Sequence, residues 1–434
     1  MLSFSYFSVP ILMSTVYSSS IDEKIAQEVV PPKPIIDVSK LVMHLGAPEH
    51  VRSIYMTQCV VGTPSFRKDL VKIAETTEIN SIIIDIKDYT GRIAFETNNP
   101  KLSHAVSDEC GAYDMKEFVR MLNEKEIYVI GRITVFQDPY YTKAFPHLAV
   151  KKASATSTLW ADYKGLNFID VGAEEYWDYI AELAKESFRI GFDELNFDYI
   201  RFPSDGNMKD IYYPYSEETV NADINAGKAE VVELFFAYLH NELDNFVVKS
   251  LSIEGEIQET SPVTSADLFG MVTTNTDDLN IGQQLERALP YFDYIAPMTY
   301  PSHYPTGFNG WVNPNNHVYG VLKFSMDSAV KRTIATTTSV KTLTNSRVGT
   351  STPIIYDKLA YDPNKLRPWL QDFDYGGDYD IAEVRAQIQA TYDSGLNSWM
   401  LWAPTNRYTI GALEPNYTPH IMPTSTATST STLP

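Results

Sequence analysis

The chain has 434 residues, of which 44% are hydrophobic and 12% aromatic, and this supply of core-forming side chains excludes a globally disordered protein. Its 55 acidic residues against 35 basic residues give a net charge of −20. A chain this acidic, without a cluster of Lys or Arg, repels phosphate backbones, so we expect no nucleic-acid partner.

Both ends of the sequence differ in composition from its middle. Residues 1–48 contain an apolar run from Phe4 to Val16 and then turn Ser-rich, which resembles the core of an export signal although no Lys or Arg precedes it. The run is too short to span a bilayer comfortably. We expect an exported, cell-surface or extracellular protein whose only membrane contact is an anchor in this leader; an unprocessed leader on a cytoplasmic protein is the alternative. Residues 413–434 are rich in Ser, Thr and Pro and predict a disordered tail.

From residue 49 to residue 412, short β-branched or aromatic runs alternate with segments of helical apolar spacing. In the first half of this region the expected strands are residues 53–62, 81–93, 128–138 and 194–203. The expected helices that follow them are residues 65–79, 114–127, 173–191 and 229–246.

The second half keeps this alternation. The expected strands are residues 265–273, 293–304, 367–373 and 398–404, and the expected helices are 281–292, 324–339 and 381–395. Alternating β and α elements predict a parallel sheet, and eight repeats predict its closure into a single (β/α)8 barrel. No GxGxxG follows the first strand, which weighs against a dinucleotide-binding fold.

The two cysteines, Cys59 and Cys110, belong to no CxxC motif and no Cys/His cluster. We therefore expect no structural zinc site. Two buried thiols are the favoured interpretation over a disulfide, so cysteine content does not fix the compartment. The histidines are scattered, with His303 alone near a strand end, and we expect neither a metal centre nor a cofactor.

Active sites of such barrels lie where the strands end, so polar residues at strand carboxyl ends are the candidate site residues. Asp85 closes the second strand, Arg132 lies in the third and Asp198 ends the fourth, with Arg201 just beyond it. Asp277 and Asp278 follow the fifth strand. The remaining candidates end the last three strands and are Met298, Tyr300, His303, Gln371, Asp372 and Trp402.

Asp198 is the strongest of these candidates. Alternation along residues 196–199 places Asn196 and Asp198 on one face of the strand, with Phe197 and Tyr199 on the other. The polar pair then points to the barrel axis, where a carboxylate costs free energy unless it is paired or used. Two acidic residues at the start of this strand, Asp193 and Glu194, and Asp293 at the start of the sixth, are expected to face solvent or to cap.

Carboxylates and aromatic rings on one rim suit glycoside hydrolysis. One carboxyl donates a proton to the leaving oxygen while another acts as nucleophile or base, and flat rings stack on sugars. Structural alternatives remain for two residues. Asp85 could form a buried ion pair with Lys87 or Arg132, and Trp402 could simply fill the barrel.

Five segments together resemble a known family: IIIDIKDYTGRI, ELNFDYIRFPSDG, DYIAPMTYPSHY, RPWLQDF and SWMLWAP. They are similar to a mostly bacterial family described as a putative glycosyl hydrolase domain, domain of unknown function 4015. The resemblance covers about residues 50–410. It implies a barrel and a glycosidase, and it names no substrate.

A more distant resemblance is to the chitinase-like glycoside hydrolases of family 18. Their fourth strand carries an alternating acidic motif that ends in a proton-donating glutamate; Asp193, Asn196 and Asp198 match its aspartate positions, with Asn196 as a replacement. Ile200 stands at the position of the glutamate and cannot donate a proton. Met298 and Tyr300 resemble that family's sixth strand. Trp402 resembles the tryptophan beneath its sugar site.

These observations support a glycoside hydrolase that acts on a carbohydrate substrate. Asp198 is the expected nucleophile or base, and Asp372 or else Asp85 the expected proton donor. Arg132 and Arg201 would orient carboxylates or contact substrate, as would Gln371 and Met298, while Tyr300 would stabilise the transition state and Trp402 would stack on a sugar.

A non-catalytic glycan-binding barrel is the second hypothesis, and a carboxylate-metal esterase or deacetylase is the third. The first two differ in whether a second carboxyl lies within reach of Asp198. Loop residues Trp160, Tyr163, Tyr304 and Trp311 are expected to form a sugar-binding rim or else to pack ordinarily, and residues 205–228 could cover the cleft. The sequence specifies neither the sugar, the linkage nor the oligomeric state.

Overall fold

The computed structural model describes residues 37–223, 226–340 and 354–416. The leader and tail predicted from the sequence lie for the most part outside these residues. The chain divides into two compact units, residues 1–40 and residues 41–434. The described part of the first unit is a short 3-10 helix, Val38–Lys40, and the second unit contains the barrel.

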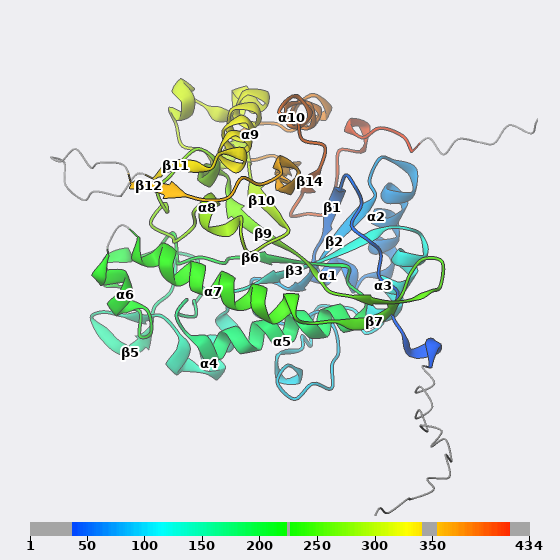
Figure 1. Ribbon diagram of the computed structural model, residues 1–434, viewed down its shortest axis with the longest axis horizontal. Coiled ribbons are helices and arrows are strands. Elements are labelled where there is room, and N and C mark those ends of the chain that lie inside the picture. Colours follow the sequence, from blue (N-terminus) through cyan, green and yellow to red (C-terminus); the bar gives the residue numbers. More distant parts are fainter. Residues whose placement is uncertain (1–36, 224–225, 341–353, 417–434) are drawn as a thin grey trace, which may run out of the picture. The chain divides into compact units, whose positions relative to one another are not determined.

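Eight parallel strands close into a barrel and so confirm the predicted (β/α)8 fold (Figure 1). Around the barrel their order is β1, β14, β13, β10, β9, β6, β3, β2, and β2 pairs with β1 again. The strands are β1 (Arg52–Met56), β2 (Ser81–Lys87), β3 (Tyr128–Thr134), β6 (Glu194–Asp198), β9 (Val263–Phe269), β10 (Tyr294–Met298), β13 (Trp369–Gln371) and β14 (Trp399–Trp402).

Helices cover the outside of the barrel, with α5 beside α7 and α9 beside α10 (Figure 1). Helix α10 begins in a capping box, in which Asp380 and Glu383 satisfy each other's backbone N–H groups. The helices are α1 (Gln58–Val61), α2 (Pro64–Thr76), α3 (Met115–Glu124), α4 (Pro139–Ala144), α5 (Glu174–Ile190), α6 (Glu217–Ala222), α7 (Gly227–Asp244), α8 (Leu285–Ala288), α9 (Val318–Ile334) and α10 (Ile381–Asp393).

Several predicted boundaries were wrong. The first expected strand, 53–62, is β1 followed by α1, and the helix expected at 281–292 is only the single turn α8. Among the described residues, three antiparallel strand pairs lie outside the barrel and were missed, because strands of two to five residues are too short to show a clear period. They are β4 (Lys151–Lys152) with β5 (Ala155–Leu159), β7 (Val248–Leu251) with β8 (Ile257–Thr260), and β11 (Thr337–Val340) with β12 (Ile354–Asp357).

The strands separate two hydrophobic cores. Outward-facing residues such as Phe197 join the large core beneath the helices, and burying each such side chain contributes roughly 1.5–3 kcal/mol. Inward-facing residues, including Tyr128, Ala296 and Trp369, fill the barrel itself. Asn196 and Asp198 are buried on the inward face, as the alternation along β6 predicted.

Asp193 and Glu194 were predicted to face solvent or to cap, and the solvent-facing alternative was wrong for both. Glu194 is fully buried at the amino end of the barrel, 2.7 Å from the Arg367 guanidinium, and accepts a hydrogen bond from the Tyr128 hydroxyl. Asp193 is also buried and accepts the backbone N–H groups of Leu45 and Val129. These partners come from distant segments, so the pattern within β6 could not reveal them. Asp293 is exposed, as expected, and accepts the backbone N–H of Thr264.

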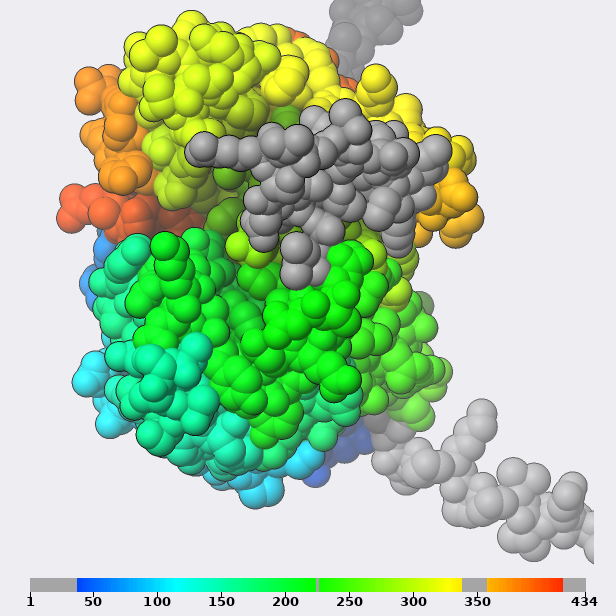
Figure 2. Space-filling model, turned by 90° about the vertical axis from the view of Figure 1, so that its left-hand side faces the viewer, coloured from blue at the N-terminus to red at the C-terminus, as the bar shows by residue number. Residues whose placement is uncertain are grey.

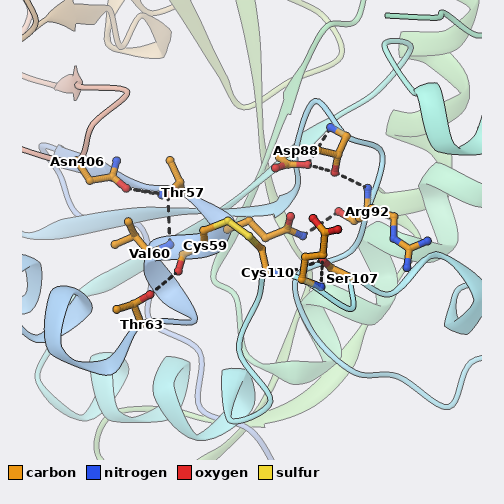
Figure 3. The surroundings of a disulfide bond; sticks show 12 residues. Thr57, Cys59, Val60, Thr63, Asp88, Arg92, Ser107, Cys110 and Asn406 are labelled. Atoms are coloured by element: carbon orange, nitrogen blue, oxygen red, sulfur yellow. Dashed lines mark hydrogen bonds between the residues drawn. A yellow bond between two sulfur atoms is a disulfide. The ribbon is translucent and has the colours of Figure 1, made fainter.

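Cys59 and Cys110 form a disulfide, so the prediction of two free thiols was wrong (Figure 3). Cys59 lies on α1 directly after β1, and Cys110 lies in the loop after β2. Because β1 and β2 are neighbours, these loops lie side by side although the two cysteines are separated by 51 positions in the sequence. Gly62 and Gly111 permit this approach, since a Cβ atom on Gly62 would lie 2.2 Å from the carbonyl oxygen of Gly111.

The loops at the carboxyl ends of the strands gather on one face, which Figure 2 shows. The loops after β3 and β6 (teal and green) lie below, and the loop after β10 (yellow-green) lies above. Among the described residues no helix has both the length and the apolar character needed to cross a membrane.

Candidate active site

Arg132 on β3 is the centre of a cluster of carboxylates inside the barrel. Its Nη1 donates to Oδ1 of Asp85 on β2 at 2.7 Å, and its Nη2 donates to Oδ2 of Asp198 on β6. Register places these side chains together, since Asp85 pairs with Arg132, and Thr134, two residues along β3, pairs with Asp198. The structure thus unites three of the predicted site residues and selects Arg132, not Lys87, as the partner of Asp85. Lys87 instead pairs with Asp138 at 2.9 Å.

Asp85 is held by two donors. Besides Arg132, the hydroxyl of Tyr55 on β1 donates to its Oδ2. Burial raises the pKa of Asp85 to about 6, although Arg132 and the Tyr55 hydroxyl both favour the ionised form and oppose this shift. A carboxyl of this pKa exchanges a proton near neutral pH, which general acid–base catalysis requires. Tyr55 was not predicted as a site residue.

The backbone changes direction sharply after Asp198. Tyr199 has a φ of 53°, a left-handed conformation that is unusual for a bulky side chain and costs on the order of 1–3 kcal/mol. The backbone N–H of Tyr199 donates to Oδ1 of Asp198, so both carboxylate oxygens are fixed. The next residue, Ile200, is fully buried in the outer core. No acid therefore occupies the position at which the chitinase-like enzymes carry their glutamate.

Asp267 on β9 is a third carboxylate in this cluster, and the sequence analysis missed it. Its Oδ1 accepts hydrogen bonds from Asn196 Nδ2 at 2.9 Å and from Trp369 Nε1 at 2.7 Å, and its Oδ2 lies 3.6 Å from Arg132 Nε. Burial, aided by the nearby charge of Asp198, raises the pKa of Asp267 to about 8. The sequence did contain a pattern that could have identified Asp267, since Ser265 and Asp267 alternate along their strand in the same way as Asn196 and Asp198.

Aromatic rings cover the guanidinium. The ring of Trp402 on β14 stacks on Tyr55, with 4.1 Å between centroids, and meets Trp369 edge-on at 5.5 Å. The Cζ atom of Arg132 lies 5.2 Å from the Trp402 ring centroid, within the range of a cation–π interaction. Trp402 is only partly buried, unlike Trp369, so its ring forms an accessible surface directly above the charged cluster.

A row of rings leads from the cluster to the surface. The pKa of Tyr300 is raised well above its usual value by burial and by the charges of Asp267 and Asp198, so its hydroxyl keeps its proton. The Tyr300 ring lies 5.4 Å from that of His303 and 6.0 Å from that of Phe373. His303 in turn lies 6.0 Å from the exposed ring of Tyr375. Met298, at the end of β10, is partly exposed.

Three other predicted residues have partners of their own. Both oxygens of Asp372 accept from Thr409, one from its backbone N–H and one from its hydroxyl. Gln371 is fully buried and joins the loop after β10 through the backbone N–H and hydroxyl of Ser302. Arg201 donates to the carbonyl of Phe202 and lies over the rings of Tyr199 and Phe269. Each of these contacts stabilises a loop or strand end.

The loop residues also differ in role. Trp160 is buried and donates to the carbonyl of Asn207, and Tyr304 is buried against Ser325, so both pack ordinarily. Trp311 stacks on His317 at 5.1 Å, whereas Tyr163 is 80% exposed. Of the loop acids, Asp277 and Asp278 accept backbone N–H groups of their own turn.

The described residues contain no group of three or more His, Cys, Asp and Glu side chains placed to hold a metal ion. Within the cluster the carboxylate oxygens of Asp85 and Asp198 are already hydrogen-bonded to Arg132, Tyr55 and the backbone. The chemistry that this arrangement offers is proton transfer and stabilisation of positive charge.

The fold and the cluster define a closed (β/α)8 barrel with carboxylates at the carboxyl ends of its strands, the face on which enzymes of this fold carry their active sites. The chain belongs to the family described as putative glycosyl hydrolase domain, domain of unknown function 4015, which it matches over residues 53–408. The family predicted from the sequence motifs is thereby confirmed. No protein with a curated description matches the chain.

Two solved glycoside-hydrolase structures have a similar fold, and a third structure is related in sequence over part of the chain. The glycoside hydrolase domain of PgaB (BpsB) from Bordetella bronchiseptica is 12% identical, with a TM-score of 0.54 over 82% of this chain and 95% of that one. Alpha-L-fucosidase isoenzyme 2 from Paenibacillus thiaminolyticus is 11% identical, with a TM-score of 0.51 over 84% of this chain and 48% of that one. A hypothetical protein from Ruminiclostridium thermocellum is 31% identical over 49% of this chain and 96% of its own, with a TM-score of 0.40.

Proposed function

We propose that the protein is a glycoside hydrolase that cleaves O-glycosidic bonds of a polysaccharide or cell-surface glycan at the carboxyl face of the barrel. The observation that carries this proposal is the attachment of Asp85 and Asp198 to two nitrogens of one guanidinium. Two carboxyls within reach of each other are what acid–base glycoside hydrolysis requires. This arrangement also favours an enzyme over a non-catalytic glycan-binding barrel.

The two carboxyls take different roles because their environments differ. Asp198 accepts hydrogen bonds from Arg132 on one oxygen and from the backbone on the other, and this fixed orientation suits a nucleophile or base. Asp85, whose pKa burial raises to about 6, suits the proton donor. Asp372 fits that role less well, because its oxygens are hydrogen-bonded to Thr409 and not to the Arg132 guanidinium that holds Asp198. Because Asp85 and Asp198 bind the two terminal nitrogens of one guanidinium, we expect a separation of about 5 Å between the two carboxyl groups, which is typical of retaining enzymes.

The charge of the cluster suits the transition state. When Asp85 gives its proton to the leaving oxygen, Asp85 and Asp198 are both anionic against the single guanidinium of Arg132, so the cluster becomes negative as the glycosidic bond breaks. A buried negative site stabilises the positive charge that develops on an oxocarbenium-like sugar. Trp402 offers a face for the sugar ring, and Tyr300 keeps a hydroxyl proton to donate. The row of rings from Tyr300 to the exposed Tyr375 suits a chain of sugars.

The test is hydrolysis of a panel of polysaccharides and aryl glycosides by the wild type and by Asp198→Asn, Asp85→Asn and Asp293→Asn. Asp293 is exposed at the amino end of β10 and serves as the matched control. We expect the first two variants to lose activity by about 10²–10⁴-fold while remaining folded, and the control to retain it. If the wild type cleaves nothing but binds a glycan array, the glycan-binding barrel replaces the hydrolase.

We also propose that the protein is exported to an oxidising compartment. Support comes from the disulfide between Cys59 and Cys110 together with the apolar run between Phe4 and Val16. Cell fractionation with a thiol-reactive label tests this. Export predicts an extracytoplasmic protein whose cysteines react only after reduction, and a cytoplasmic protein with free thiols would contradict it.

A further inference from the structure

Asp267 differs from the other two carboxylates in the way its oxygens are used. Its Oδ1 accepts two N–H donors, from Asn196 and Trp369. Its Oδ2 is buried and has no hydrogen-bond partner, and neither does Nε of Arg132, which lies 3.6 Å away. The residue is 1% exposed, so solvent does not satisfy it either. Ionising a carboxyl group whose second oxygen is buried without a hydrogen bond costs free energy.

The surrounding charges make a third anion unfavourable. Asp198 on β6 and Asp85 on β2 take the two terminal nitrogens of Arg132, which leaves only Nε for Asp267. The titratable groups that face the cluster from β1 and from the end of β10 are Tyr55 and Tyr300, which supply no positive charge. Three anions against one cation would leave the buried cluster with a charge of −2.

We propose that Asp267 is a positioning residue that holds a proton on Oδ2 in the resting protein and thereby leaves the Arg132 guanidinium to Asp85 and Asp198. The proton lies on Oδ2 because Oδ1 is occupied by two donors. With Asp267 neutral, the net charge of the cluster is −1 when Asp85 is ionised and zero when Asp85 carries its own proton. Like charges in close proximity cannot all ionise, so the carboxyl without a hydrogen bond to Arg132 is the one that holds the proton.

This inference agrees with the pKa of Asp267, which burial and the charge of Asp198 raise to about 8. This raised pKa makes the folding stability depend on pH. Between about pH 4, where the unfolded carboxyl ionises, and about pH 8, the folded protein holds a proton that the unfolded chain has released. Folding stability of the wild type therefore falls as pH rises through this window, and a variant without the carboxyl lacks that contribution.

The first test requires no activity. The melting temperature is measured from pH 4 to pH 9 for the wild type, Asp267→Asn and the exposed control Asp293→Asn. The quantity of interest is the melting temperature of Asp267→Asn minus that of the wild type. We expect this difference to increase by about 2 °C or more between pH 5 and pH 8, whatever its sign at pH 4. The control should show no such trend. A pH-independent difference for Asp267→Asn would overturn the proposal.

The second test observes the proton directly. In protein labelled with ¹³C at the aspartate carboxyls, the wild type should show one resonance that titrates near pH 8. That resonance should be absent in Asp267→Asn and should titrate at lower pH in Asp198→Asn, because the neighbouring charge is gone. A resonance that persists in Asp267→Asn, or is unmoved in Asp198→Asn, contradicts the assignment.

The third test rests on the proposed hydrolase. The pH profile of kcat/KM for a cleaved aryl glycoside should have an inflection near pH 8 in the wild type and in Asp293→Asn, and none in Asp267→Asn. A purely structural residue would lower activity without removing the inflection, and that result would refute the positioning role. If the protein hydrolyses nothing, the proposed function fails, while the first two tests still decide whether Asp267 holds the proton.

Discussion

Arg132 and Asp267 face each other inside the barrel without a hydrogen bond, with 3.6 Å between Nε of the guanidinium and Oδ2 of the carboxyl. The two terminal nitrogens of the same guanidinium donate hydrogen bonds to Asp85 and Asp198. The Arg132 cation therefore contacts three carboxyls, of which Asp85 and Asp198 accept a hydrogen bond and Asp267 does not. This inequality separates their protonation behaviour, because the carboxyl with the weakest contact to the cation is the one most readily neutralised.

Replacing Arg132 with Leu should strongly destabilise the fold. Removing one partner of a buried ion pair leaves charges that neither water nor protein compensates, which costs about 3–5 kcal/mol. The measurement is urea unfolding at pH 7, with Arg120→Leu as the control, since Arg120 forms an exposed pair with Glu124 on α3. That pair should contribute under about 1 kcal/mol. Equal losses in the two variants would show that the cluster is not a charged unit.

Tyr55→Phe should raise the pKa of Asp85 above its value of about 6. The Tyr55 hydroxyl donates to Asp85 and favours its anion, so its loss favours the neutral acid. If Asp85 is the proton donor, activity falls as pH rises through its pKa, and this limb of the pH profile should move to higher pH. Tyr319→Phe is the matched control, because that exposed hydroxyl donates to Asp393. An unmoved limb in Tyr55→Phe argues against Asp85 as the donor.

Trp402→Ala should weaken glycan binding by roughly tenfold, since ring stacking of this kind contributes about 0.5–1.5 kcal/mol. We expect Trp402→Ala to raise KM and to change kcat less. Trp402→Phe should retain part of the binding that the alanine variant loses. Trp311→Ala serves as the control, because Trp311 stacks on His317 in the loop after β10. Equal effects of the two alanine variants would place Trp402 among the packing residues only.

Replacing both cysteines with serine should lower the unfolding free energy by about 2–4 kcal/mol, because the disulfide closes a long segment between Cys59 and Cys110. Thermal unfolding with and without dithiothreitol checks this. The wild type should lose stability on reduction, and the double variant should not respond to the reductant. A wild type that is insensitive to the reductant under conditions where the bond is reduced would show that the bond contributes little.

Local patterns in the sequence predicted the fold and one site residue. The alternation of β-type runs and helical segments predicted eight parallel strands, and the alternation of Asn196 and Asp198 placed both inside the barrel. These features are encoded in residues close together in the chain, where the periods of strands and helices act. The motifs around Asp85 and Trp402 likewise identified the family.

Other features depended on closure of the barrel. Asp267 was overlooked within an apolar run, and its importance follows from Arg132 and Trp369, which reach it from other strands. The Cys59–Cys110 bond likewise depends on the adjacency of β1 and β2. The sequence by itself determined which residues form strands and which face inward, because those properties are local. Only the tertiary structure decided which carboxyls share a guanidinium, because strand register and barrel closure bring together side chains that are distant in the chain.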